Sequence, residues 1–166
     1  MSDVSWMWGD GKMMSQAGRE KIKDNDLFYL CGWIDDIARK TKNTRSCVVN
    51  LLGKERLEKI YDLADVYHSD NIDRVSDDFI EEAKIREGDY DNVGCCHYSI
   101  PSHWDIGKVY KRLIKQVAAN EKISVVEVLI KVYNSFLSPK IDDYNSSMYY
   151  ENPSYLFECY RENQIL

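Results

Sequence analysis

The sequence lacks a long apolar run and a secretion signal. No apolar stretch approaches the roughly 20 residues that a helix needs to span a bilayer, so we expect no membrane partner. The first residues, MSDVSWMWGDGK, have neither the basic start nor the apolar core of a signal peptide. With Met1 taken as the native start, the sequence predicts a cytoplasmic protein.

Basic residues are too few for a nucleic-acid-binding surface. The chain has 22 Lys and Arg against 28 Asp and Glu, a formal net charge of −6. Nonspecific binding to nucleic acid depends on neutralising phosphates, so we expect no nucleic-acid partner. A helix-turn-helix DNA-binding motif is also disfavoured, because Arg45 is the only basic residue of the short helix predicted at 43–52. The acidic balance favours a basic protein as partner and leaves the oligomeric state open.

The five cysteines are an odd number, and no secretion signal accompanies them. They are Cys31, Cys47, Cys95, Cys96 and Cys159. Reduced thiols are therefore expected rather than a disulfide framework. Cys31 and Cys47 fall on apolar stripes, where we expect them to act as small core residues.

Apolar residues, 44% of the chain, recur mainly at helical spacing. From Asp26, one face of a first helix is formed by Leu27, Leu30, Cys31, Ile34, Ile37 and Ala38. Further helix starts are indicated by capping residues at Thr44, Asp70 or Asn71, Ser102, Ser124 and Asn152. Gly53 is expected to follow the second helix, Tyr67 to lie in the third and Pro139 to stop the sixth after Phe136. These patterns predict an all-α fold of six or seven helices.

The two halves of the chain resemble each other at a shift of 80 residues. Identical pairs are Ile34 and Ile114, Ala38 and Ala118, Lys42 and Lys122, Val48 and Val128, and Leu57 and Leu137. The order of predicted elements matches as well. We therefore predict two similar helical halves packed together: an arm at 1–23, a first repeat at 24–86, a connector at 87–101 and a second repeat at 102–166. A chance likeness between amphipathic helices is the alternative. Trp6 and Trp8 of the arm are expected to pack back onto the body.

Residues 26–80 carry a helix, a short helix, an aromatic-ended helix from Ile60-Tyr61 to Tyr67-His68, and a closing helix around 75–80. In this order they resemble a family of short uncharacterised bacterial helical domains often encoded beside ADP-ribosyltransferase-like toxins. The family has no catalytic residues to transfer. The resemblance implies a small accessory protein, such as an antitoxin or immunity partner.

The connector contains the stretch GCCHYSIPSHW, with Cys95, Cys96, His97 and His103. A structural zinc site needs four such ligands, commonly as two spaced pairs. Adjacent cysteines cannot easily both ligate from one turn, and a proline and a predicted helix cap separate the histidines. A cysteine nucleophile would need a base and an orienting group such as Asp105. A small metal- or cysteine-dependent enzyme is thus the alternative function, but we expect no metal or cofactor here.

Tyrosines of the second half form the predicted partner-binding surface. Tyr149, Tyr150 and Tyr155 lie in SSMYYENPSYLFECY, and tyrosine is enriched at protein interfaces. Tyr67 and His68 form a second candidate cluster at a helix end, where a histidine also suits the helix dipole. For both clusters a role in packing or capping competes with partner binding. The predicted function is a non-catalytic protein-binding protein.

Four pairs of adjacent acidic residues lie in the predicted helices. They are Asp35-Asp36, Asp77-Asp78, Glu81-Glu82 and Asp142-Asp143. Paired carboxylates can bind a divalent cation or activate water. Exposed, solvated helix faces explain them more simply, and we expect these acids to lie there.

Overall fold

The computed structural model describes residues 22–166, so the predicted packing of Trp6 and Trp8 lies outside the described residues. Within this range the chain folds into eight α-helices and one 3-10 helix, with no β-strand. The predicted all-α class is confirmed. The bounds are α1 Asp24–Thr41, α2 Arg45–Asp62, α3 Ala64–Tyr67, α4 Ile72–Ala83, α5 His103–Glu121, α6 Val125–Tyr133, α7 Leu137–Ile141, η2 Met148–Tyr150 and α8 Pro153–Glu162.

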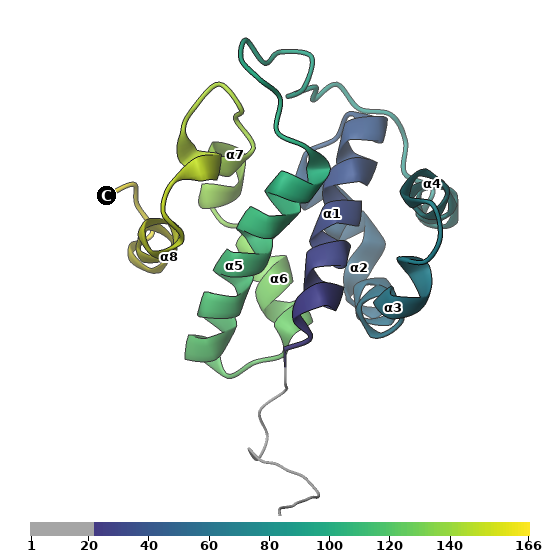
Figure 1. The fold of residues 1–166 in the computed structure, drawn as a ribbon, viewed down its shortest axis with the longest axis horizontal. Coiled ribbons are helices and arrows are strands. Elements are labelled where there is room, and N and C mark those ends of the chain that lie inside the picture. Colours follow the sequence, from purple (N-terminus) through teal and green to yellow (C-terminus); the bar gives the residue numbers. More distant parts are fainter. Residues whose placement is uncertain (1–21) are drawn as a thin grey trace, which may run out of the picture.

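Helices α1 and α5 lie side by side at the centre of the molecule (Figure 1) and form its most extensive helix pair. Helices α2 and α6 also pack on each other. Helix α4 packs on α1 and α8 packs on α5, so these two helices occupy opposite ends of the molecule (Figure 1). Each half therefore contributes equivalent helices to one continuous core.

The ends of the helices correspond between the halves. Lys42 after α1 and Lys122 after α5 both adopt the left-handed conformation, with φ of 56° and 57°. The next helices are capped by Thr44 and Ser124, whose hydroxyls accept hydrogen bonds from backbone amides three residues later. Asn71 and Asn152 cap α4 and α8 in the same way, each accepting from the amide two residues later. These shared caps fit the similarity seen in the sequence.

Gly53, expected just past the end of the second predicted helix, has a non-helical φ of 80° and ψ of 161° and separates two helical stretches that together form α2, so the predicted break is present. Two other predicted helix ends differ in the structure. The predicted third helix breaks at Leu63, before the short helix α3. Helix α6 ends at Tyr133, and Pro139 lies in the first turn of α7. Proline is tolerated there because amides of the first turn have no partner within the helix.

The acidic pairs are only partly where the sequence placed them. Asp77, Asp78, Glu81 and Glu82 of α4 are exposed as expected. Asp35, Asp36 and Asp142 are instead buried, with 1%, 8% and 2% of their surface exposed. The prediction was wrong for the first pair because every residue of α1 from Leu30 to Ala38 is buried, so this stretch has no solvated face.

None of the helices in the described range is long and apolar enough to cross a membrane.

Candidate functional site: a groove between α5 and α8

A groove of about 520 Å³ opens between α5 and the segment formed by η2 and the start of α8. The end of the connector closes one side. The lining residues are Ser99, Ile100, Pro101, Asp105, Lys108, Val109, Arg112, Leu113, Tyr149, Tyr150, Glu151, Asn152, Pro153 and Leu156. We call this feature the α5–α8 groove. Two of the three tyrosines predicted from the sequence as partner-binding line it.

The rim of the groove is apolar and exposed. Tyr150 is 69% exposed and Ile100 48%. Tyr149 is half-buried and packs edge-on against both Tyr144 and Tyr150, with ring centroids 5.7 Å and 4.8 Å apart. Desolvation raises the pKa of Tyr149 above its ordinary value. An aromatic rim around a concave surface is a favourable setting for protein binding.

The two acidic side chains of the groove accept hydrogen bonds from nearby residues. Asp105 accepts a hydrogen bond from the backbone amide of Ser102, as part of the capping box that starts α5. Glu151 accepts one from the Ser147 hydroxyl.

Lys108 and Arg112, one helical turn apart on α5, are both exposed, and neither forms an ion pair within the described residues. The two cations are therefore available to a ligand. Sequence reasoning did not identify them, although their spacing of four residues around Val109 was a usable signal.

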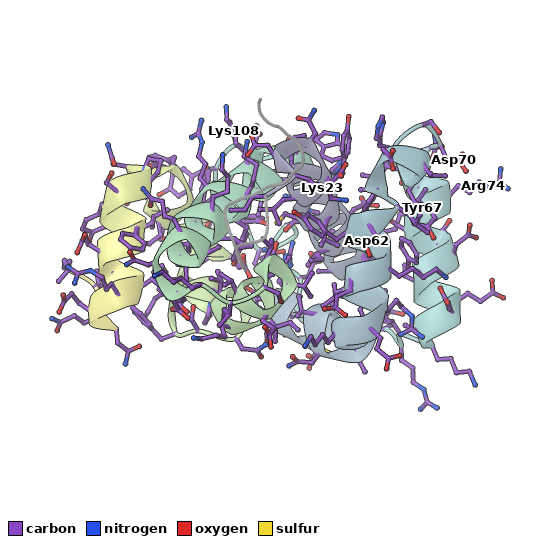
Figure 2. All side chains as sticks on the ribbon, turned by 90° about the horizontal axis from the view of Figure 1, so that it is seen from below. Lys23, Asp62, Tyr67, Asp70, Arg74 and Lys108 are labelled. Carbon is purple, nitrogen blue, oxygen red and sulfur yellow. The ribbon has the colours of Figure 1, made fainter. Side chains whose placement is uncertain are left out.

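The remaining predicted partner-binding residues lie elsewhere. Tyr155 is outside the groove lining and donates its hydroxyl proton to the Leu166 carbonyl, 2.7 Å away. Tyr67 packs edge-on against Trp33 and Phe79. The exposed His68 stacks on Tyr29. Figure 2 shows Tyr67 at the α3–α4 end, with Lys108 between that end and α8. The structure therefore does not bring the two predicted clusters together.

The cysteines and histidines of the connector do not form a shared site. Within the described residues, no group of three or more His, Cys, Asp and Glu side chains is placed to hold a metal ion. Cys95 is exposed, while the thiol of Cys96 points to the backbone carbonyls of Tyr98 and Tyr144.

The two histidines of this stretch contact different residues. The backbone amide of His97 donates to Asn145. His103 lies at the start of α5 with its Nδ1 3.8 Å from a carboxylate oxygen of Asp36, whose other oxygen accepts from the Ser76 hydroxyl. No Cys–His pair of this stretch has the contact that an activated thiol needs.

A buried ion pair within the first half, between Asp35 and Arg45, is contacted from the second half by Tyr144. Asp35 accepts hydrogen bonds from Arg45 and Arg39, each over 2.7 Å, and from the Tyr144 hydroxyl over 3.2 Å. Arg39 also donates to the Pro101 carbonyl beside the groove. Because Asp35 and Arg45 are each 1% exposed, this cluster holds segments together rather than meeting a ligand. Arg45, the only basic residue of the helix considered for DNA binding, is therefore buried and inaccessible to DNA.

Asp142 forms a second buried polar cluster. One carboxylate oxygen accepts from the Tyr110 hydroxyl over 2.8 Å, and Tyr110 also contacts the Ser138 hydroxyl over 2.8 Å. Burial raises the pKa of Asp142 to about 7, and the charge of Arg45 opposes part of that rise. Burial likewise raises the pKa of Tyr110 well above its ordinary value. The cluster ties α5 to α7.

Comparison with protein-family models, curated proteins and solved structures finds no match to this chain. The resemblance of residues 26–80 to toxin-associated helical domains therefore stays a prediction.

Proposed function

We propose that this chain is a non-catalytic protein-binding protein that holds its partner in the α5–α8 groove. The observation that carries the proposal is the open groove itself, lined by the exposed Ile100 and Tyr150. Large apolar side chains gathered around a concave surface mark interaction sites more often than scattered ones do. Tyrosines also supply much of the binding energy of protein interfaces.

The biological role proposed from the resemblance is that of an antitoxin or immunity partner of a bacterial toxin, acting in the cytoplasm. The net charge of −6 and the exposed acids of α4 support a partner that is basic overall, because opposite charges speed encounter. The groove would then supply the short-range contacts that hold the complex. The partner itself would be identified by affinity capture.

The test begins with affinity capture of partners from the native host on the immobilised full chain. The captured protein is then purified, and its Kd is measured for wild type and for single variants by calorimetry. Tyr149→Ala and Tyr150→Ala should each weaken binding by about tenfold or more, since buried interface tyrosines commonly contribute on that scale. Val66→Ala is the matched control, because Val66 is 60% exposed on α3 at the other end of the molecule.

The same measurement separates the groove from the other predicted residues and from the enzyme alternative. Tyr155→Ala and His68→Ala report whether the predicted surface extends beyond the groove. A Cys95→Ser, Cys96→Ser, His97→Ala triple variant should bind the partner as the wild type does. Equal Kd values for wild type, Tyr149→Ala and Tyr150→Ala would reject the groove as the binding site.

A further inference from the structure

The first half of the molecule contains a counterpart of the α5–α8 groove that is filled with aromatic rings. Between α1 and the α3–α4 segment, Tyr29 stacks on His68 with ring centroids 4.6 Å apart and an angle of 9° between the rings. Trp33, one turn further along α1, lies edge-on to Tyr67 at 6.0 Å. Trp104 closes the cluster against Tyr29 at 5.4 Å. The side chains of α1 thus fill the space between the helices.

The second half lacks these rings at the equivalent positions. The residues 80 positions after Tyr29 and Trp33 are Val109 and Leu113, and both line the groove. Aligning the helix caps Asn71 and Asn152 puts Tyr149 at the position of His68. Tyr149 therefore faces a groove where His68 faces a stacked ring. The groove corresponds to the space that aromatic side chains occupy in the first half.

The same comparison explains the charge of the groove. The residues 80 positions after Phe28 and Gly32 are Lys108 and Arg112. Two cations therefore flank Val109, where the first half has one ring and one glycine beside Tyr29. Their ammonium and guanidinium groups make no ion pair within residues 22–166. An arginine can hold a carboxylate through two parallel hydrogen bonds.

Resting on the proposed function, we infer that the α5–α8 groove accepts an aromatic side chain of the partner, next to a carboxylate that Lys108 and Arg112 bind. The ring stacks on Tyr149 and Tyr150 over Val109, as Tyr29 stacks on His68 in the first half. The contacting segment of the partner is thus aromatic and acidic, even where the partner as a whole is basic. Long-range attraction and the short-range anchor involve different residues.

The experiment uses two small probes, N-acetyl-tryptophan, which carries a carboxylate, and N-acetyl-tryptophanamide, which does not. Each is titrated into the isotope-labelled full chain and followed by amide NMR shifts. Both should shift amides of groove residues, and the carboxylate probe should bind about fivefold more tightly, as expected for one exposed charge contact. Val109→Tyr should abolish binding of both probes by filling the groove.

A Lys108→Gln, Arg112→Gln double variant should remove the fivefold preference and leave amide-probe binding unchanged. Lys59→Gln, Arg86→Gln is the control with the same change in net charge, on exposed residues of the first half. Equal affinity of the two probes for wild type, or no shift at groove amides, would overturn the inference. The proposed function would still stand if Tyr150→Ala weakens partner binding. A dimer that dissociates in Tyr150→Ala would identify a second copy as the occupant and also overturn the inference.

Discussion

Gly32 of α1 and Gly107 of α5 lie against each other where the two central helices pack. A Cβ atom added to Gly107 would lie 3.0 Å from the backbone nitrogen of Gly32 and 3.2 Å from its Cα. A Cβ added to Gly32 would lie 2.3 Å from the ring of Trp104. The absence of both side chains therefore sets the distance between the helices, and with it the positions of α5 and the groove wall.

Gly107→Ala is expected to destabilise the protein by about 1–3 kcal/mol, because the new methyl group meets backbone atoms that cannot rotate away. The sign is informative, since alanine in an unconstrained helix would stabilise by roughly 0.5–1 kcal/mol. Urea denaturation measures the effect. Ala119→Gly, at an exposed position of α5, calibrates the contribution of helix propensity. A more stable Gly107→Ala variant would show that the helices can separate at no cost.

The helices could be predicted from sequence because their starts are local. Ser102 and Ser124, predicted as helix caps, each form a capping box with the acid three residues later. The break at Gly53 was predicted from the glycine itself, which adopts a φ of 80°. The break at Leu63 was not predicted, because apolar residues at helical spacing continue across this position. Pro139 was misread because its effect depends on its place in the helix. The apolar spacing thus predicts where helices form, and individual capping or breaking residues decide where they end.

The candidate site could be predicted only in part. Tyr149 and Tyr150 stood out by composition, but Lys108 and Arg112 resemble any exposed helix face until α8 is placed beside α5. Burial of Asp35 was not predictable either, because its compensating partner Arg45 lies on another helix. Both features depend on contacts between segments that are distant in the sequence. The spacing of residues along the chain does not predict such contacts.

Arg45→Met is expected to destabilise the protein by roughly 3–5 kcal/mol, the usual cost of leaving a buried charge without its partner. Asp35 would keep Arg39 but lose the 2.7 Å hydrogen bond from Arg45. Urea denaturation at pH 7 gives the difference in free energy of unfolding. Arg161→Met, which breaks exposed pairs with Glu158 and Glu162, should change stability by less than about 0.5 kcal/mol. Similar effects for the two arginines would contradict the importance of burial.

The thiols should react in an order set by exposure. Cys95, which is exposed, should react first with an aromatic disulfide reagent at pH 8. Cys31 is fully buried, and burial raises the pKa of its thiol to about 12, so it should react only when the chain unfolds, at least roughly a thousandfold more slowly. Absorbance of the released thiolate follows the reaction, and Cys95→Ser should remove the fast phase. Fast reaction of all five thiols would show that the core opens readily.

The raised pKa of Asp142 predicts how stability depends on pH. The carboxyl ordinarily titrates near 3.8, and burial raises its pKa to about 7 in the folded protein. Between these values the folded state holds a proton that the unfolded state has released, so the contribution of Asp142 to stability falls as pH rises from about 4 to about 7.

Asp142→Asn imitates the protonated carboxyl and can still accept the hydrogen bond from Tyr110. Relative to wild type, the variant should therefore gain stability as pH rises through this window, by at most about 1.4 kcal/mol per pH unit. Urea denaturation of both proteins at pH 5, 6, 7 and 8 measures the change, and the difference should level off above pH 7. A constant difference from pH 5 to pH 8 would mean that Asp142 keeps the same ionisation in the folded and unfolded chain, which its burial against Tyr110 and Ser138 argues against.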